Sequence, residues 1–94
     1  MGFTIAGDSL TLPVTEAGQS IAIPLHATQC RVYNAGPNNC RIRYGRGAQL
    51  VTNAGMLMPA GLMETHTKHG ADTLSAKCNA GEMATLEITC GTSD

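Results

Sequence analysis

The sequence predicts an all-β protein, a single compact β-sandwich or jelly-roll-like domain of about seven to eight short antiparallel strands. Eleven Thr, eleven Gly and four Pro among 94 residues favour short strands with tight turns over helices. Apolar and polar residues alternate in several segments, as in a strand with one buried face. The tripeptide Asn-Ala-Gly at 34–36, 53–55 and 79–81 supplies turn chemistry at three expected strand ends.

The alternation places strands at both ends of the chain. In Leu10–Val14 and Ser20–Leu25, aliphatic residues alternate with polar or small ones, and Thr73–Cys78 and Met83–Cys90 repeat the pattern. No linker or low-complexity segment divides residues 1–94, so they are expected to form one domain. The segment Met1–Ser9 precedes the first clear strand and is interpreted as an N-terminal arm that reaches a neighbour or frays.

Turn residues define the strands in the middle of the chain. Tyr44–Gly47 and Pro59–Gly61 are the breaks that separate them. The middle strands are expected at Gln29–Asn34, Cys40–Tyr44, Ala48–Thr52 and Leu62–Lys68.

A hairpin is expected where residues 35–39 join the segments that contain Cys30 and Cys40. Pairing Asn34 with Cys40 sets the register. The apolar face then carries the pairs Val32 with Ile42 and Cys30 with Tyr44. The other face carries Gln29, Arg31, Tyr33, Arg41 and Arg43, with Arg31 opposite Arg43.

Charge and composition indicate a chain whose surface forms interfaces with other protein chains. Charged residues are 14% of the chain, aromatic residues 3%, and the formal net charge is −1, which gives little solubility of its own. General binding to nucleic acid is not expected, because acids outnumber bases. No basic n-region precedes an apolar run and no apolar stretch approaches a membrane span, so the chain is interpreted as intracellular and soluble, without membrane contact.

Four of the six basic residues lie in and just after the expected hairpin. These are Arg31, Arg41, Arg43 and Arg46, and no acid occurs between Ala17 and Met63. One interpretation is a solvated strand face whose arginines spread apart in water. The other is a docking face for carboxylates of a partner, with Tyr33 beside the arginines, since Arg binds carboxylate in a bidentate geometry.

The cysteines are interpreted as buried structural residues. Cys30, Cys40, Cys78 and Cys90 fall on the apolar phase of their strands, at spacings far from those of a zinc site. They are expected to be reduced when the chain is made and to pack as small hydrophobes. A disulfide between Cys78 and Cys90, or one across two sheets, stays open if the protein works outside a cell.

No catalytic or metal site is expected, and no cofactor. His66 and His69 would point to opposite faces of a strand, so they do not chelate together even with Glu64 nearby, and His26 is isolated. No catalytic motif or phosphate-binding glycine loop occurs. The chain is therefore predicted not to be an enzyme.

Methionines crowd a segment that contains Pro and Gly. Met56, Met58 and Met63 lie there, with Leu57 and Leu62. They either plug one end of the sandwich or form an adaptable subunit interface, a role that suits flexible Met side chains.

Two segments resemble a pattern in small proteins of tailed phages and prophages. The segments are Cys30-Arg31-Val32-Tyr33-Asn34-Ala35-Gly36 and Cys40-Arg41-Ile42-Arg43-Tyr44-Gly45; Pro59-Ala60-Gly61 and the closing strand Ala84–Gly91 are also similar to that group. The resemblance covers roughly Thr28 to Gly91, and the sequence departs from the group where its cysteines replace aliphatic residues.

This resemblance implies a virion structural protein with a β-sandwich or jelly-roll fold. The best-matched role is a capsid decoration (cement) protein that is made in the bacterial host cytoplasm and located on the capsid surface. It would bind the major capsid protein as a homo-oligomer, with a trimer favoured, and it would stabilise the shell. Two alternatives stay open: a head–tail or tail structural protein, and a small β-sandwich module that binds carbohydrate.

Overall fold

The computed structural model describes residues 3–5, 9–52 and 54–93. These residues form nine strands and no helix. The strands are β1 (Phe3–Ile5), β2 (Leu10–Val14), β3 (Gln19–Ala22), β4 (Gln29–Pro37), β5 (Cys40–Gly45), β6 (Met56–Met58), β7 (Met63–Thr67), β8 (Thr73–Lys77) and β9 (Ala84–Ser93).

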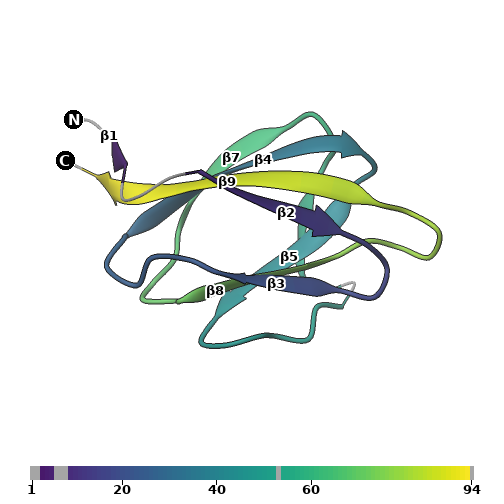
Figure 1. Cartoon of the computed structure of the whole chain (residues 1–94), viewed down its shortest axis with the longest axis horizontal. Helices are drawn as coiled ribbons and strands as arrows, with labels where there is room; N and C mark the ends of the chain where they lie inside the picture. Colours follow the sequence, from purple (N-terminus) through teal and green to yellow (C-terminus); the bar gives the residue numbers. More distant parts are fainter. Residues whose placement is uncertain (1–2, 6–8, 53, 94) are drawn as a thin grey trace.

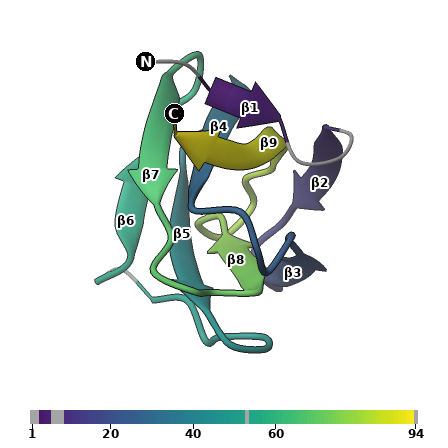
Figure 2. The same ribbon diagram turned by 90° about the vertical axis from the view of Figure 1, so that its left-hand side faces the viewer.

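The strands form two antiparallel sheets that pack face to face (Figures 1 and 2). In the five-stranded sheet the order is β1-β9-β4-β7, and β2 also pairs with β9, alongside a different part of that strand from β1. The four-stranded sheet has the order β3-β8-β5-β6. From β2 onward, every connection except β5–β6 passes from one sheet to the other. The order β2-β9-β4-β7 facing β3-β8-β5-β6 is that of an eight-stranded jelly roll. The fold class expected from the sequence is therefore confirmed.

The core lies between the two sheets, where the alternating apolar side chains meet. Val32, Leu86 and Ile88 of the five-stranded sheet have no exposed surface, and Leu74 of the four-stranded sheet has none either. Removing such side chains from water is the main stabilising contribution to folding, roughly 1.5–3 kcal/mol for each large aliphatic residue. The inward phase of the strands was predicted correctly from the alternation.

The expected hairpin between β4 and β5 is wrong. β4 pairs with β7 and β9, whereas β5 pairs with β6 and β8, so the two strands belong to different sheets. Arg31 lies opposite Thr65 on one side and Thr89 on the other, and Arg43 lies opposite Ser75. The turn residues between the strands therefore serve a connection that changes sheet.

Asn34 lies where the chain begins to pass from one sheet to the other, and the polar atoms of its buried side chain are hydrogen-bonded. Its side chain is fully buried; the Nδ2 group donates to the carbonyls of Asn38, at 3.0 Å, and Met58, at 2.8 Å. Its Oδ1 atom accepts from the backbone N–H of Gly36 at 2.8 Å. The register of β4 shifts just after Asn34, and Gly36 there has a φ of 85°, which a residue with a side chain rarely adopts. The Asn-Ala-Gly tripeptide thus ends the regular part of β4, as its chemistry predicts.

Two further segments differ from the sequence prediction. The expected strand at Ala48–Thr52 does not form. The strand that follows β5 in the chain is β6, which pairs with β5. Within the expected arm Met1–Ser9, Phe3–Ile5 form β1 and pair with Gly91–Ser93, while residues 1, 2 and 6–8 lie outside the described residues. Asn53 of the second Asn-Ala-Gly tripeptide also lies outside them.

The cysteines are buried, as predicted, but two of them are not free thiols. Cys30 and Cys90 are directly opposite each other on β4 and β9 and form a disulfide, with Cα atoms 4.0 Å apart. This corrects the expectation of four thiols and both alternatives, the pairing of Cys78 with Cys90 and a disulfide across the two sheets, because β4 and β9 are neighbours in one sheet. Cys40 and Cys78 are free and buried. Burial, together with the nearby Cys78, raises the pKa of Cys40 to about 12, so its thiol stays protonated and unreactive at neutral pH.

Candidate functional site

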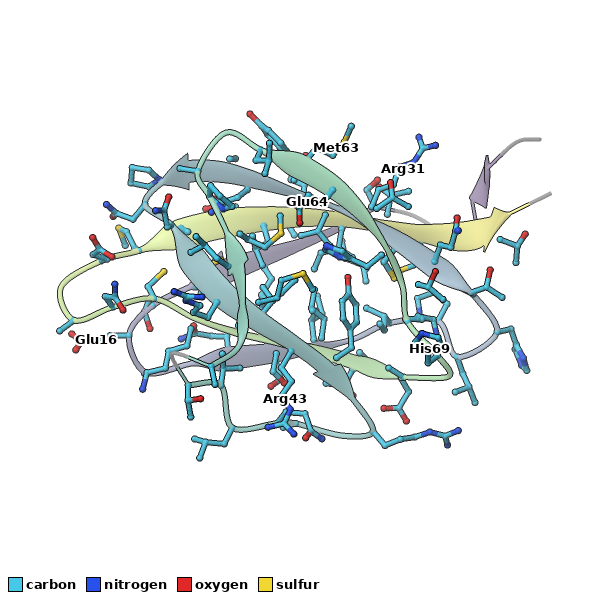
Figure 3. The ribbon with its side chains drawn as sticks, turned by 180° about the vertical axis from the view of Figure 1, so that it is seen from behind. Glu16, Arg31, Arg43, Met63, Glu64 and His69 are labelled. Atoms are coloured by element: carbon cyan, nitrogen blue, oxygen red, sulfur yellow. A yellow bond between two sulfur atoms is a disulfide. The ribbon has the colours of Figure 1, made fainter. Side chains whose placement is uncertain are left out.

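The outer face of the five-stranded sheet carries three of the residues proposed to contact a partner. Arg31 and Tyr33 project from β4, and Met63 is paired with Tyr33 on the neighbouring strand β7. Tyr33 is 39% exposed and Met63 60%. Figure 3 shows Arg31 and Met63 on the same side of the molecule.

Few charged residues occupy this face, and the described strands and loops leave it uncovered (Figures 1 and 2). Arg31 on β4 and Glu87 on β9 are its two outward-facing charged residues among those described. The other exposed side chains that face outward from these strands include Thr11, Pro13, Tyr33, Ala35, Met63, Thr65 and Thr67. A face that carries Tyr, Met and Arg and has little net charge resembles the surfaces that bind other proteins.

The apolar surface continues around the edge formed by β6 and β7. Both are end strands of their sheets, and they lie on the same side of the sandwich (Figure 2). Met56 and Leu57 on β6 are 42% and 41% exposed, and Leu62, just before β7, is 41% exposed. Exposed edges with apolar side chains are places where another chain can pair or pack.

Arg41 and Arg43 lie on the opposite side of the molecule from Arg31. Both project from β5 onto the outer face of the four-stranded sheet, and Figure 3 shows Arg43 far from Arg31 and Met63. Arg46 follows the end of β5, where its charge helps lower the pKa of Asp72. The four arginines therefore do not form the single docking face that the hairpin prediction gave, because β4 and β5 are in different sheets.

The outer face of the four-stranded sheet is partly covered by the connection between β5 and β6. Gln49 donates its backbone N–H to the hydroxyl of Ser75 at 2.9 Å, and Val51, which belongs to this connection, is buried. Nη1 of Arg41 donates to the carbonyl of Gly55 at 3.1 Å. The two sheets therefore present different outer faces, one bare and one partly covered.

Met58 is not a surface residue, which corrects its prediction as a partner contact. It has no exposed surface, lies opposite Cys40 and belongs to the core between the sheets. Met56, two residues earlier on the same edge strand, is half-exposed. Of the three methionines, Met56 and Met63 are free to contact a partner.

A hydrogen-bonded chain of three polar side chains links the sheets at the β7 edge, and the sequence did not suggest it. The hydroxyl of Tyr44 on β5 lies 2.7 Å from Nδ1 of His66 on β7, and Nε2 of His66 lies 3.2 Å from Oε1 of Glu64. In the tautomer that donates from Nε2 to the Glu64 carboxylate, Nδ1 of His66 accepts a hydrogen bond from the Tyr44 hydroxyl. Burial, with the added charge of Glu64, raises the pKa of Tyr44. His69 is exposed at a turn and takes no part in this chain.

Two charged residues stabilise the loops at the far end of β7. The ammonium of Lys68 is buried and donates to the carbonyls of Leu25, at 3.2 Å, and Ala71, at 2.5 Å; burial lowers its pKa. Oδ1 of Asp72 accepts from the backbone N–H of Gly47 and from the hydroxyl of Thr73, and these hydrogen bonds lower the pKa of Asp72. Both groups have structural partners and leave no open ligand position.

Comparison with known proteins gives no relative for this chain: no family model, curated protein or solved structure matches it. Among residues 3–5, 9–52 and 54–93, no three His, Cys, Asp or Glu side chains are placed to hold a metal ion. No helix within the same residues has the length and hydropathy needed to cross a bilayer.

Proposed function

We propose that this chain is a virion structural protein of a tailed phage, a decoration protein that binds the major capsid protein and stabilises the shell. The observation that carries the proposal is the bare outer face of the five-stranded sheet, with Tyr33 and Met63 paired at its β7 side. We assign the contact with the shell to this face and to the apolar edge of β6 and β7.

The composition of this face favours a protein partner over other ligands. Arg31 and Glu87 carry opposite charges, so the face lacks the positive field that nucleic acid requires. Tyr33 is the one aromatic side chain among its described residues, whereas sugar-binding faces usually stack rings on several. Large, partly apolar and nearly uncharged surfaces bind protein, with Tyr and Met as anchoring residues.

The fold supports this proposal by analogy. Jelly rolls of this strand order occur in viral capsid domains, and also in lectins and cupins. Fold alone does not determine function, so the assignment to a virion depends on the sequence resemblance together with the bare face. A subunit that binds the assembled shell but not its free components stabilises the shell by mass action.

The proposal is tested first by measuring how much of the chain is in the particle. Particles are isolated from cells that make this protein, and the chain is quantified against the major capsid protein by mass spectrometry. We expect comparable copy numbers, and fragile shells when the chain is deleted. A few copies per particle would reassign the chain to the neck or tail, and its absence from particles would contradict the virion assignment.

The face is tested by substitutions on the two sheets. Tyr33→Ala together with Met63→Ala removes the exposed pair from the bare face without touching the core. We expect at least about a tenfold loss of binding to shells that lack the chain, the size of effect found for anchoring residues. Arg43→Gln on the opposite sheet is the matched control and should bind as the unmodified protein does. Equal binding of the double variant and the control would reject this face.

A further inference from the structure

Two cations face each other on the outer side of the four-stranded sheet. Arg41 on β5 and Lys77 on β8 are register partners, and both side chains project away from the core. The sequence did not single out Lys77, because its pairing with Arg41 depends on strands that are more than thirty residues apart in the chain. Like charges directly across a strand pair destabilise a sheet, so this placement calls for a compensating group.

No carboxylate among the described residues lies within ion-pair distance of either cation. Arg41 uses Nη1 to bind the carbonyl of Gly55, which fixes the guanidinium but adds no negative charge. Lys77 has no hydrogen-bond or ion-pair partner among the described residues.

The two cations line a pair of adjoining cavities. The cavities have volumes of about 490 and 430 Å³, within the range of sites that bind small groups, and they share Arg41, Lys77 and Asn79. The wall of the first includes Leu50 and the wall of the second includes Leu57, so apolar surface flanks the charged centre on either side. We call the combined space the Arg41–Lys77 groove.

We infer that the Arg41–Lys77 groove binds a carboxylate side chain of an extended acidic peptide segment from a protein partner. A guanidinium held by one hydrogen bond keeps further N–H donors for a carboxylate, and the neighbouring ammonium adds a second charge-assisted hydrogen bond. Leu50 and Leu57 accommodate apolar residues on either side of the acid.

Two acids on the walls select for a single negative charge. Glu16 lines the first cavity and Glu82 the second, and neither forms an ion pair with Arg41 or Lys77. A polyanion such as nucleic acid would place further negative charges against these carboxylates, which is unfavourable. The two cations and the two acids of the lining sum to zero formal charge, so a bound carboxylate is held by the adjacent pair of cations and not by a net positive charge of the groove.

The test is a titration of the ¹⁵N-labelled full chain, followed by NMR, with the capped peptide acetyl-Leu-Glu-Leu-amide. We expect saturable changes in the chemical shifts of the backbone amides of Arg41, Lys77 and Asn79. The dissociation constant should be on the order of 1 mM for so short a peptide. The matched Leu-Gln-Leu peptide should bind at least about tenfold more weakly, because it lacks the charge. Equal shifts with the two peptides would overturn the inference.

Variants on the same sheet complete the test. Arg41→Gln and Lys77→Gln should each weaken binding of the Glu peptide by about tenfold. Arg43→Gln should not, because Arg43 is on the same strand and face as Arg41 but outside the two cavities. Lys77→Gln should also leave the melting temperature unchanged or raise it, because it removes a like-charge contact. Unaltered peptide binding by both groove variants would overturn the assignment, as would saturation of the groove by inorganic phosphate at lower concentration than the peptide.

This inference does not depend on the proposed function. The groove lies on the four-stranded sheet, and the proposed contact with the shell lies on the five-stranded sheet. Failure of the peptide titration would leave the shell-binding result unaffected, and the reverse holds as well.

Discussion

At the scale of single residues, inward-facing polar groups distinguish one edge of this sandwich. Along β7, Glu64 and His66 occupy the phase that faces the opposite sheet, where aliphatic residues are usual. Tyr44 reaches them from β5, so the edge is held by hydrogen bonds in place of apolar packing. Inward-pointing polar residues on an end strand also discourage pairing with a further strand.

The burial of Tyr44 leads to a prediction about its ionisation. Tyr33→Phe leaves Tyr44 as the sole tyrosine of the chain, so tyrosinate absorbance then reports on this residue alone. We expect no ionisation up to the ordinary pKa of 10.0, because burial and Glu64 raise the pKa of Tyr44 in the folded state. Because the folded state favours the protonated hydroxyl, the free energy of unfolding is not reduced by Tyr44 below pH 10.0. It decreases as the pH rises from 10.0 toward the folded-state pKa.

Ultraviolet absorbance during an alkaline titration, with circular dichroism to follow the fold, checks this prediction. Tyr44→Phe is the control, since its signal comes from the half-exposed Tyr33. Ionisation of the Tyr33→Phe protein at or below pH 10 while it remains folded would contradict the hydrogen-bonded chain as described.

Residue patterns predicted which side chains face the core but not which surfaces they share. The alternation correctly separated buried Cys30 and Val32 from exposed Arg31 and Tyr33. It did not separate core Met58 from half-exposed Met56, because residues two apart on a strand share a face, and their burial differs only through what packs on them in the folded structure. The Tyr44–His66–Glu64 chain was not predictable, since it joins side chains of two sheets.

At the scale of elements, the strands were predicted better than their partners. Leu10–Val14 agrees with β2 residue for residue, and the other matching strands differ by a few residues at their ends. The pairing of β4 with β5 was wrong because turn residues report a change of direction, whether the next strand joins the same sheet or the opposite one. Register depends on contacts between strands that are distant in sequence, which local patterns do not contain.

The disulfide between β4 and β9 leads to a prediction about stability. It closes a loop with a sequence separation of 60, and in the chain-entropy description a loop of this length contributes about 4 kcal/mol. We expect reduction, or the double change Cys30→Ala and Cys90→Ala, to lower the free energy of unfolding by roughly 2–5 kcal/mol.

Urea unfolding with and without a reductant measures this effect. The double change Cys40→Ala and Cys78→Ala is the control: it loses some core packing but should keep the same response to the reductant, since both of its cysteines are free thiols. An unfolding midpoint of the unmodified chain that does not respond to the reductant would show that the bridge does not contribute to stability in solution.

At the scale of the whole molecule, the two sheets present chemically different outer surfaces. The five-stranded sheet offers apolar and hydroxyl groups with two opposite charges, and the four-stranded sheet offers two facing cations in a groove. Because screening by salt weakens exposed charge interactions and leaves apolar contacts largely intact, the two binding events should respond differently to ionic strength.

Between about 0.05 and 0.5 M NaCl, we expect binding to shells to change by less than about threefold and binding of the Glu peptide to weaken by more than that. Co-sedimentation with shells and the NMR titration measure the two affinities under the same conditions. A steep loss of shell binding in salt would move the contact to the cationic face.

The central position of β9 also bears on how the protein is made. β1, β2 and β4 all pair with β9, which comes after every other strand described here. While the chain is being synthesised, β1 and β2 have no partner in their own sheet until β9 has left the ribosome, and β4 has only β7. The five-stranded sheet therefore assembles after translation of the last strand, and a ribosome stalled before residue 84 carries a chain with exposed strand edges, a natural target for chaperones and proteases.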